Sequence, residues 1–163
     1  MTDPLQELSR EGRIGGAGTS FLRDVPLIDM TDFEARKVEI GDALWDAATG
    51  IGLFQLSGHI LDQAQIDRAF EMTEAFFDLP RDEKAALPLR PGTTAGWEFK
   101  SQIRPSTGTP DQKESYQITR PRMDGLWPSE AAIPGFHATM LGFERANWTI
   151  AMQVLSCFAV KLG

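Results

Sequence analysis

Few side chains in this sequence could carry metal or nucleophilic chemistry. The 163 residues include two histidines, His59 and His137, and one cysteine, Cys157. A cysteine-rich zinc site is therefore excluded, and a histidine-based metal site would need both imidazoles. Cys157 lies among apolar residues with no base near it in the sequence, so we expect a buried, unreactive thiol.

Composition narrows the class of protein. Sixteen basic residues against 23 acidic ones give a net charge of -7, which argues against a nucleic-acid partner. No apolar run approaches the roughly 18 residues that a membrane span needs, so we expect no membrane insertion. The polar start of the chain shows no secretory signal, and a single cysteine forms no internal disulfide. These features predict one globular domain in the cytoplasm.

The first half of the chain predicts short strands alternating with helices. Glycines interrupt residues 1–22, which we expect to be a flexible leader. Strands are predicted at 25–29 and 53–56. A capping box at 31–34 predicts a helix towards Ala48, whose inward residues would be Ile40, Leu44, Ala47 and Ala48. A second box at Asp62 predicts a helix with one apolar face, made of Ile66, Phe70, Thr73 and Phe77, flanked by Ala69 and Phe76.

The second half predicts irregular segments and a final long helix. We expect Arg81–Lys84 to form a solvated helix face, residues 89–112 to be mainly loop, and 113–119 to form a strand. The helix spans 135–162. Its predicted apolar stripe comprises Phe136, Met140, Phe143, Ile150, Val154, Phe158 and Leu162, widened by Leu155 and Ala159. Either the preceding helices cover this apolar face, as in a small α+β domain, or the face is an interface with residues that this chain does not contain.

The order of several short segments resembles one enzyme family. Val25–Met30, Gly52–His59 and Phe76–Lys84 are similar to N-terminal motifs of the isopenicillin N synthase-like, non-haem Fe(II)/2-oxoglutarate-dependent dioxygenases. Further matches follow in the same order: Asp111–Tyr116, Leu126–Pro128, Ile133–Phe136 and Ala159–Gly163. The departures are Gly58-His59-Ile60 in place of Asn-His-Gly, and Gly96-Trp97 in place of Gly-Tyr.

The resemblance implies an α+β fold of helices with a few strands, the N-terminal part of a double-stranded β-helix (jelly-roll) oxygenase. Residues 23–163 would be this N-terminal domain, and we expect the C-terminal jelly-roll core to be absent from the chain. The complete enzyme would bind Fe(II) through two histidines and one carboxylate, and 2-oxoglutarate through Arg-x-Ser. The relatives oxidise small organic substrates, and some of them do not use 2-oxoglutarate.

The implied ligand motifs do not stand where the family would have them. Asp62 is one residue too far from His59 for His-x-Asp, and Arg104-Pro105-Ser106 precedes His137. We therefore assign no catalytic residue and no metal ligand to this chain, and expect neither cofactor to bind it alone. A makeshift site from His59, His137 and an acid is the alternative. Otherwise, we expect His59 to hydrogen-bond locally at a strand end and His137 to lie in the first turn of the long helix.

Trp97, Phe99 and Arg104 are the candidate substrate-binding residues. They stand in a Gly/Pro-rich segment that approaches the active site in the family, and such loops often carry specificity. The alternative is an aromatic pair that fills the edge of the core.

Three interpretations of the whole chain remain. It is a fragment of an oxygenase, a truncated non-catalytic module that docks on a full-length relative, or one half of a split enzyme. In each, the apolar face of 136–162 would dock on a missing C-terminal domain or a partner chain. The substrate, the type of oxidation and the oligomeric state are not predicted.

Overall fold

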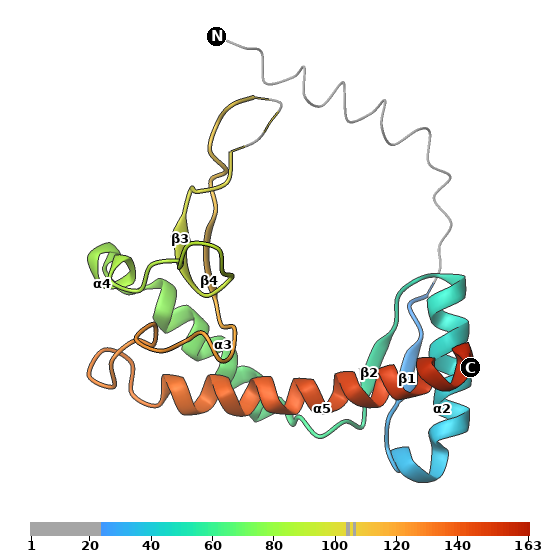
Figure 1. The fold of residues 1–163 in the computed structure, drawn as a ribbon. Helices are drawn as coiled ribbons and strands as arrows, with labels where there is room; N and C mark the ends of the chain where they lie inside the picture. Colours follow the sequence, from blue (N-terminus) through green and yellow to red (C-terminus); the bar gives the residue numbers. More distant parts are fainter. Residues whose placement is uncertain (1–23, 104, 106) are drawn as a thin grey trace.

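The computed structural model describes residues 24–103, 105 and 107–163, so the predicted leader lies outside the described residues. The fold is α+β, as predicted (Figure 1). Its helices are α2 (Phe33–Gly50), α3 (Gln63–Phe77), α4 (Arg81–Ala85) and α5 (Phe136–Leu162). Its strands are β1 (Leu27–Asp29), β2 (Gln55–Ser57), β3 (Gly96–Phe99) and β4 (Glu114–Gln117).

Helix α5 connects two lobes (Figure 1). The first lobe contains β1, β2 and α2 and lies at the C-terminal end of α5. The second contains α3, α4, β3 and β4 and lies at its N-terminal end. Because α5 contacts both α2 and α3, it fixes the position of one lobe relative to the other.

The first lobe is built on a parallel pair of strands. Leu27 pairs with Gln55, and the register continues to Asp29 and Ser57. The strand expected at 53–56 therefore lies slightly later in the chain. The strands and α2 bury a cluster that also takes Cys157 from α5. Its buried residues are Ile28, Met30, Phe33, Ile40, Leu44, Ala47 and Cys157; Ala48, predicted to face inward, is exposed.

The start of α2 differs from the predicted capping box. Thr31 does not cap the helix, because its hydroxyl donates to Asp29 Oδ1 at 2.7 Å. Asp32 takes the N-cap position instead, with a left-handed backbone at φ 54° and no side-chain cap bond. Arg36 adds to this junction by donating to Asp29 Oδ2 at 3.1 Å. The strand end and the helix start are thus held together by one carboxylate.

Helix α3 begins as predicted and packs through the flank of the predicted face. Asp62 Oδ1 accepts the backbone N–H of Gln65 at 2.7 Å, and the Gln65 side chain accepts the N–H of Asp62 at 3.1 Å, which completes the capping box. The buried residues are Ala69, Met72 and Phe76. Phe70, predicted to face inward, is 70% exposed. The apolar periodicity of α3 supports two overlapping faces, and contact with α5 selects one of them.

The second lobe holds an antiparallel hairpin, of which the sequence predicted one strand. β4 lies within the strand predicted at 113–119, whereas β3 lies in the segment 89–112 that we expected to be mainly loop. Trp97 of β3 pairs with Tyr116 of β4. Tyr116 stacks on Phe76 of α3, with ring centroids 4.1 Å apart. Its hydroxyl donates to the carbonyl of Leu126 at 2.6 Å. The hairpin therefore packs directly on α3 and on the loop before α5.

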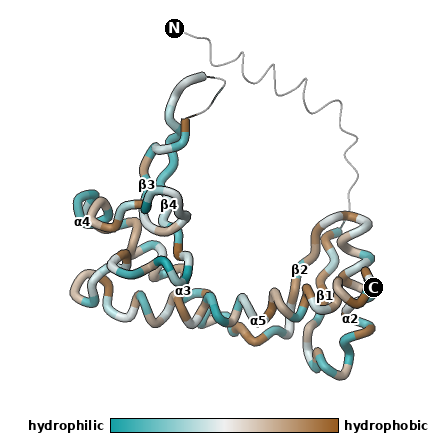
Figure 2. The backbone as a smooth tube through the Cα atoms, in the orientation of Figure 1, coloured by the Kyte–Doolittle hydropathy of each residue, from teal (hydrophilic) through white to brown (hydrophobic). Residues whose placement is uncertain are grey.

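Helix α5 matches its predicted extent within one residue. Phe136 is buried, whereas Leu162, at the other end of the predicted stripe, is 75% exposed. Figure 2 shows apolar positions along α5 and on β1 and β2. Among the described residues, no helix is long and apolar enough to cross a membrane.

Candidate functional site

Three elements of the second lobe meet at the carboxylate of Glu114 on β4. Lys84 Nζ of α4 lies 2.7 Å from Glu114 Oε1, and the indole Nε1 of Trp97 donates to the same oxygen at 2.7 Å. Lys84 also donates to the carbonyl of Phe77. Arg81, Asp82 and Glu83 are exposed, as predicted for a solvated helix face, but the Lys84 side chain is only 8% exposed, which corrects that prediction for Lys84. Lys84 is therefore buried, and its charge is balanced by the carboxylate of Glu114.

The environment of Glu114 keeps its carboxylate ionised. Burial favours the neutral acid and raises the pKa. The hydrogen bonds from Lys84 and Trp97 and the positive charges of Lys84 and Arg81 outweigh burial, so the pKa of Glu114 falls below 4.5. Glu114 is therefore a charged anchor for the hairpin.

The two described candidates for a substrate mouth lie on β3 rather than on a loop. Trp97 is buried at 8% exposure and belongs to the core cluster of the second lobe. Phe99 is half-buried and stacks on Trp97, with ring centroids 6.1 Å apart. Arg104 lies outside the described residues. The geometry thus brings Trp97 and Phe99 together, with Trp97 on the inner side.

Two cations flank the ring of Phe99. The Arg81 guanidinium lies 4.5 Å from the ring centroid, and Lys100 Nζ lies 5.1 Å from it. Cations at these distances are attracted to the electron-rich face of an aromatic ring. Reading the sequence did not single out Arg81 or Lys100 for this role, because neither position has a local pattern that points to Phe99.

The opposite side of β3 is polar. Glu98 is half-buried and accepts the hydroxyls of Ser115, at 2.7 Å, and of Ser101. These bonds hold the pKa of Glu98 below its ordinary value despite partial burial. The hairpin therefore has one aromatic side and one hydrogen-bonded polar side.

The two histidines lie in unlike surroundings. His137 is exposed in the first turn of α5, as predicted, and its ring centroid lies 4.2 Å from that of Trp127. His59 follows β2, as expected, but its Nδ1 is buried without a hydrogen-bond partner among the described residues, so this atom does not make the local bond that we predicted. The Cβ position that a side chain at Gly58 would need is taken by Asp29 and Thr31, so the backbone before His59 is closely packed.

The described residues do not fit an iron(II) site. Within the described part of the chain, no three or more His, Cys, Asp or Glu side chains are grouped closely enough to hold a metal ion. The Arg-x-Ser sequence cannot be placed, since its residues 104 and 106 lie outside the described residues. We derive no catalytic step through iron from these residues.

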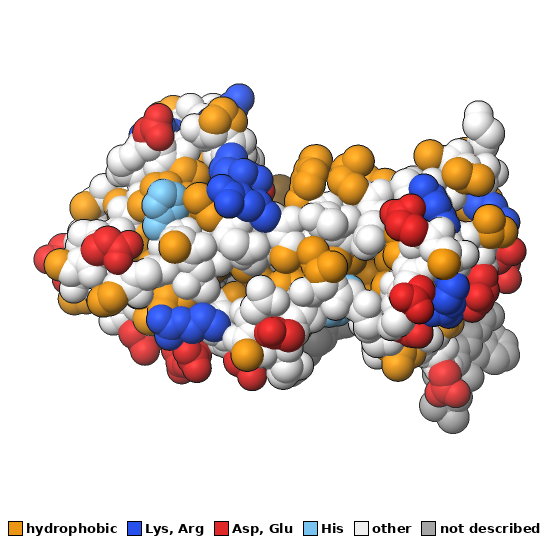
Figure 3. All heavy atoms as spheres, turned by 90° about the horizontal axis from the view of Figure 1, so that it is seen from below, with side chains coloured by type: hydrophobic (Ala, Val, Ile, Leu, Met, Phe, Trp, Pro, Cys, Tyr) orange, Lys and Arg blue, Asp and Glu red, His pale blue; other side chains and the backbone are white. Residues whose placement is uncertain are grey.

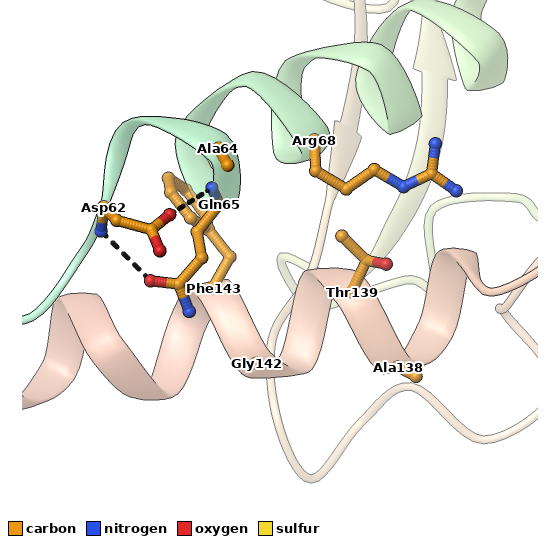
Figure 4. Close-up of a pocket in the computed structure, with 8 residues that line it drawn as sticks. All are labelled: Asp62, Ala64, Gln65, Arg68, Ala138, Thr139, Gly142 and Phe143. Atoms are coloured by element: carbon orange, nitrogen blue, oxygen red, sulfur yellow. Dashed lines mark hydrogen bonds between the residues drawn. The ribbon is translucent and has the colours of Figure 1, made fainter.

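A hollow of about 380 Å³ lies between α3 and α5 (Figure 4). Small residues form much of its wall, and three of its polar side chains are already engaged: Asp62 and Gln65 in the capping box, and Arg68 with Glu71 at 2.9 Å. The hollow comprises Asp62, Ala64, Gln65, Arg68, Ala138, Thr139, Gly142 and Phe143. We assign no chemistry to it.

Comparison with known proteins identifies the domain. The model of the family described as "non-haem dioxygenase in morphine synthesis N-terminal" matches residues 25–131, well over half of the chain. The chain belongs to this family. The dioxygenase N-terminal domain is 26% identical over 159 residues to the 2-oxoglutarate-dependent dioxygenase ecdK of Aspergillus rugulosus, covering 83% of this chain and 48% of that protein. It is 25% identical to the 2-oxoglutarate-dependent dioxygenase eupC of Phoma sp, covering 83% and 49%.

A solved structure shares the fold of this dioxygenase N-terminal domain. A full-length protein of Neurospora crassa, solved in complex with alpha-KG, matches with a TM-score of 0.68 and 26% identity, over 83% of this chain and 46% of that protein. The predicted family and fold are therefore confirmed: the helices and few strands correspond to the N-terminal part of a 2-oxoglutarate oxygenase. The chain spans about half the length of the curated relatives it matches.

Proposed function

We propose that this chain is the N-terminal portion of a non-haem Fe(II)/2-oxoglutarate-dependent oxygenase that acts on a small organic substrate. The structural match to the Neurospora crassa protein carries the proposal, because that protein was solved with alpha-KG bound and this chain corresponds to 46% of it. The sequence relatives support it, since they are named 2-oxoglutarate-dependent dioxygenases. A cytoplasmic location is proposed with it and is supported by the single cysteine.

The proposed role of the domain is to shape the substrate mouth and support the catalytic half. In such enzymes iron(II) and 2-oxoglutarate supply the oxidising chemistry, and the described residues here offer no ligand set for the metal. We therefore expect no turnover from the 163-residue chain alone. Its hairpin would place Phe99 beside the substrate, with Trp97 behind it in the core and Arg104 on the following segment.

The hairpin geometry suits this supporting role. Trp97 is fixed by its bond to Glu114, and Lys84 fixes Glu114 in turn, so the ring of Phe99 rests on a rigid base. Groups that orient a substrate work best on elements whose own side chains are held by packing and hydrogen bonds. Arg81 and Lys100 beside Phe99 would favour a substrate with a polar or negatively charged edge.

The proposal is tested by sequencing the transcript past the codon for Gly163. The expected result is a frame that continues into His-x-Asp, a distant histidine and Arg-x-Ser. The protein from that frame should release succinate from 2-oxoglutarate with iron(II), whereas the 163-residue chain should match a heat-killed control. A stop codon after Gly163, or succinate release by the 163-residue chain, would overturn the proposal.

The alternative is a non-catalytic module or split-enzyme half that docks on a full-length relative or a separate catalytic chain. The exposed apolar side chains of α5 favour some form of docking, among them Trp148 at 63% exposure. Mixing the chain with its separately produced catalytic half distinguishes the cases. Activity restored on mixing supports the split enzyme, and binding without activity supports the module.

A further inference from the structure

Two cations from different elements of the second lobe approach the ring of Phe99. Arg81, the first residue of α4, lies 4.5 Å from the ring centroid, and Lys100, which follows β3, lies 5.1 Å from it. We call Arg81 and Lys100 the cation pair. Neither is within ion-pair distance of a carboxylate among the described residues, whereas Lys84 of the same helix is neutralised by Glu114.

The cation pair is arranged so that one anion could reach both charges. Because both cations lie near one ring centroid, they are at most about 10 Å apart, which is close to the Debye length at physiological salt. Like charges at this distance repel, and the attraction of each cation to a partly exposed ring is weak. An anion bound between them would be attracted by both and would remove their repulsion.

The backbone holds Lys100 in this place. Its φ of 52° is left-handed, and its N–H donates to the carbonyl of Lys113 at 2.8 Å just beyond the end of β3. A left-handed backbone is uncommon for lysine, and residues held in such conformations are often found at functional sites. A glycine would make this turn at lower cost, so a lysine here points to a role for its side chain.

This part of the chain is basic although the whole chain is acidic. Residues 81–124 contain eight basic and six acidic residues, a net charge of +2, whereas the net charge of the 163 residues is -7. Residues 24–62, by contrast, contain two basic and eight acidic residues, a net charge of -6. Figure 3 shows groups of Lys and Arg side chains on the second lobe. A local excess of positive charge attracts anions.

We propose that the cation pair binds the carboxylate of the substrate, so that the oxygenase acts on a small organic acid whose apolar part rests against Phe99. The inference rests on the proposed function and names its substrate class. The guanidinium of Arg81 can offer two parallel N–H donors to a carboxylate, and Lys100 adds a compact charge. No other described residue accepts a hydrogen bond from this guanidinium, so its donors are available. The ring of Phe99 is fixed by stacking on Trp97.

Binding of two probes to the 163-residue chain tests the site directly. Benzoate and benzamide share a ring and nearly the same shape, but only benzoate is an anion at neutral pH. In ligand-observed NMR titrations benzoate should bind, and benzamide should bind at least about tenfold more weakly. Equal binding of the two probes, or no binding of benzoate, would overturn the inference. Inorganic phosphate that displaces benzoate with equal or higher affinity would show a general anion site and would also overturn it.

Three variants separate binding from simple loss of folding. Arg81→Gln and Lys100→Gln should each weaken benzoate binding at least about threefold and leave benzamide unchanged. Both side chains are exposed, so the two variants should melt like the parent chain. Lys37→Gln is the matched control, because Lys37 lies 5.8 Å from the centroid of Phe33 in the first lobe. A loss of benzoate binding in this control as large as in the other two would contradict the inference.

The product of the complete reading frame extends the test to turnover. In a panel of small organic acids and their primary amides, the acids should stimulate succinate release more strongly, and Arg81→Gln should reduce only the stimulation by acids. The KM for 2-oxoglutarate should stay the same in this variant. A rise in that KM would assign the cation pair to the co-substrate and overturn the inference.

The outcomes distinguish this inference from the proposed function. A longer protein that releases succinate with amides as readily as with acids would overturn the inference alone. A stop codon after Gly163, or no succinate release by the longer protein, would overturn the proposed function and the inference with it, whatever the result with benzoate.

Discussion

Glu114 Oε1 lies 2.7 Å from Lys84 Nζ and accepts the indole hydrogen of Trp97 at 2.7 Å, so that one carboxylate oxygen joins α4, β3 and β4. The Lys84 side chain is 8% exposed and that of Glu114 is 26% exposed. Removing either partner leaves the other charge in a poorly solvated place. The pair is therefore expected to matter for the stability of the second lobe, unlike ion pairs at the surface.

Lys84→Met should destabilise the domain by about 2–4 kcal/mol, because it leaves Glu114 without its countercharge. The free energy of unfolding is measured by urea denaturation. Arg68→Met is the matched control: Arg68 pairs with Glu71 at 2.9 Å, but both side chains are more than half exposed. The control should cost under about 1 kcal/mol. Equal losses in the two variants would contradict a special role for Lys84.

The Glu114 pair also predicts a pH dependence. The folded protein lowers the pKa of Glu114 below its ordinary value of 4.5, so the stabilisation is complete above that value and is lost as the pH falls through the folded pKa. The difference in unfolding free energy between the parent and Glu114→Gln should therefore be largest near neutral pH and shrink in acid. Urea titrations at a series of pH values measure it. If the difference grows as the pH falls, the pKa of Glu114 is not lowered in the folded protein.

Gly58 and Gly52 form a matched pair of glycines with left-handed backbones, at φ 64° and 81°. A side chain at Gly58 would overlap Asp29 and Thr31 and would lie 2.9 Å from the Thr31 nitrogen, whereas nothing lies within 4 Å at Gly52. Gly52→Ala should cost about 1–2 kcal/mol for backbone strain alone. Gly58→Ala should cost clearly more, since the junction of β1 and α2 must also shift. Thermal melts of the two variants check the order.

The thiol of Cys157 should react slowly in the folded protein. It is 2% exposed, and burial raises its pKa, so little reactive thiolate forms near neutral pH. Labelling by a disulfide reagent should stay slow until denaturant unfolds the first lobe. Cys157→Ser combined with Ala159→Cys provides the control, because position 159 is exposed and should label at once. Fast labelling of Cys157 in the native chain would mean that α5 leaves α2 readily.

Short sequence patterns predicted where helices and strands lie better than they predicted which side chains those elements bury. The capping box at Asp62 was predicted correctly because all of its atoms come from one turn. The inward face of α3 was predicted in part: Ala69 and Phe76, expected at its flank, are buried, and Phe77 packs against the core cluster. Phe70 was predicted to face inward and is exposed, whereas Met72 was not predicted and is buried. The contacts of α3 with α5 and with Tyr116 decide between these apolar residues.

The surroundings of the candidate site residues were harder to predict, because they depend on partners that lie far away in the sequence. Lys84 stands in a charged run that is typical of a solvated helix, and its burial requires Glu114, which follows much later in the chain. Thr31 fits a capping-box pattern as well as Asp62 does, but its hydroxyl donates a hydrogen bond to the carboxylate of Asp29 instead of capping the helix. β3 was predicted as loop because glycines and prolines surround it, and pairing with β4 outweighs that composition. In each case a contact with a residue outside the sequence motif decided the structure.

The contact between Gly41 and Cys157 bears on the order in which the chain can fold. A Cβ at Gly41 would lie 3.4 Å from the Cβ of Cys157, so α2 and α5 meet there at close range. The last buried residue of the second lobe's cluster is Phe136, whereas the cluster of the first lobe also needs Cys157, which is synthesised later. Contacts between residues far apart in sequence form slowly. During synthesis from the N-terminus, α2 is therefore made early and finds its helical partner late, after the later-made lobe has assembled its own core.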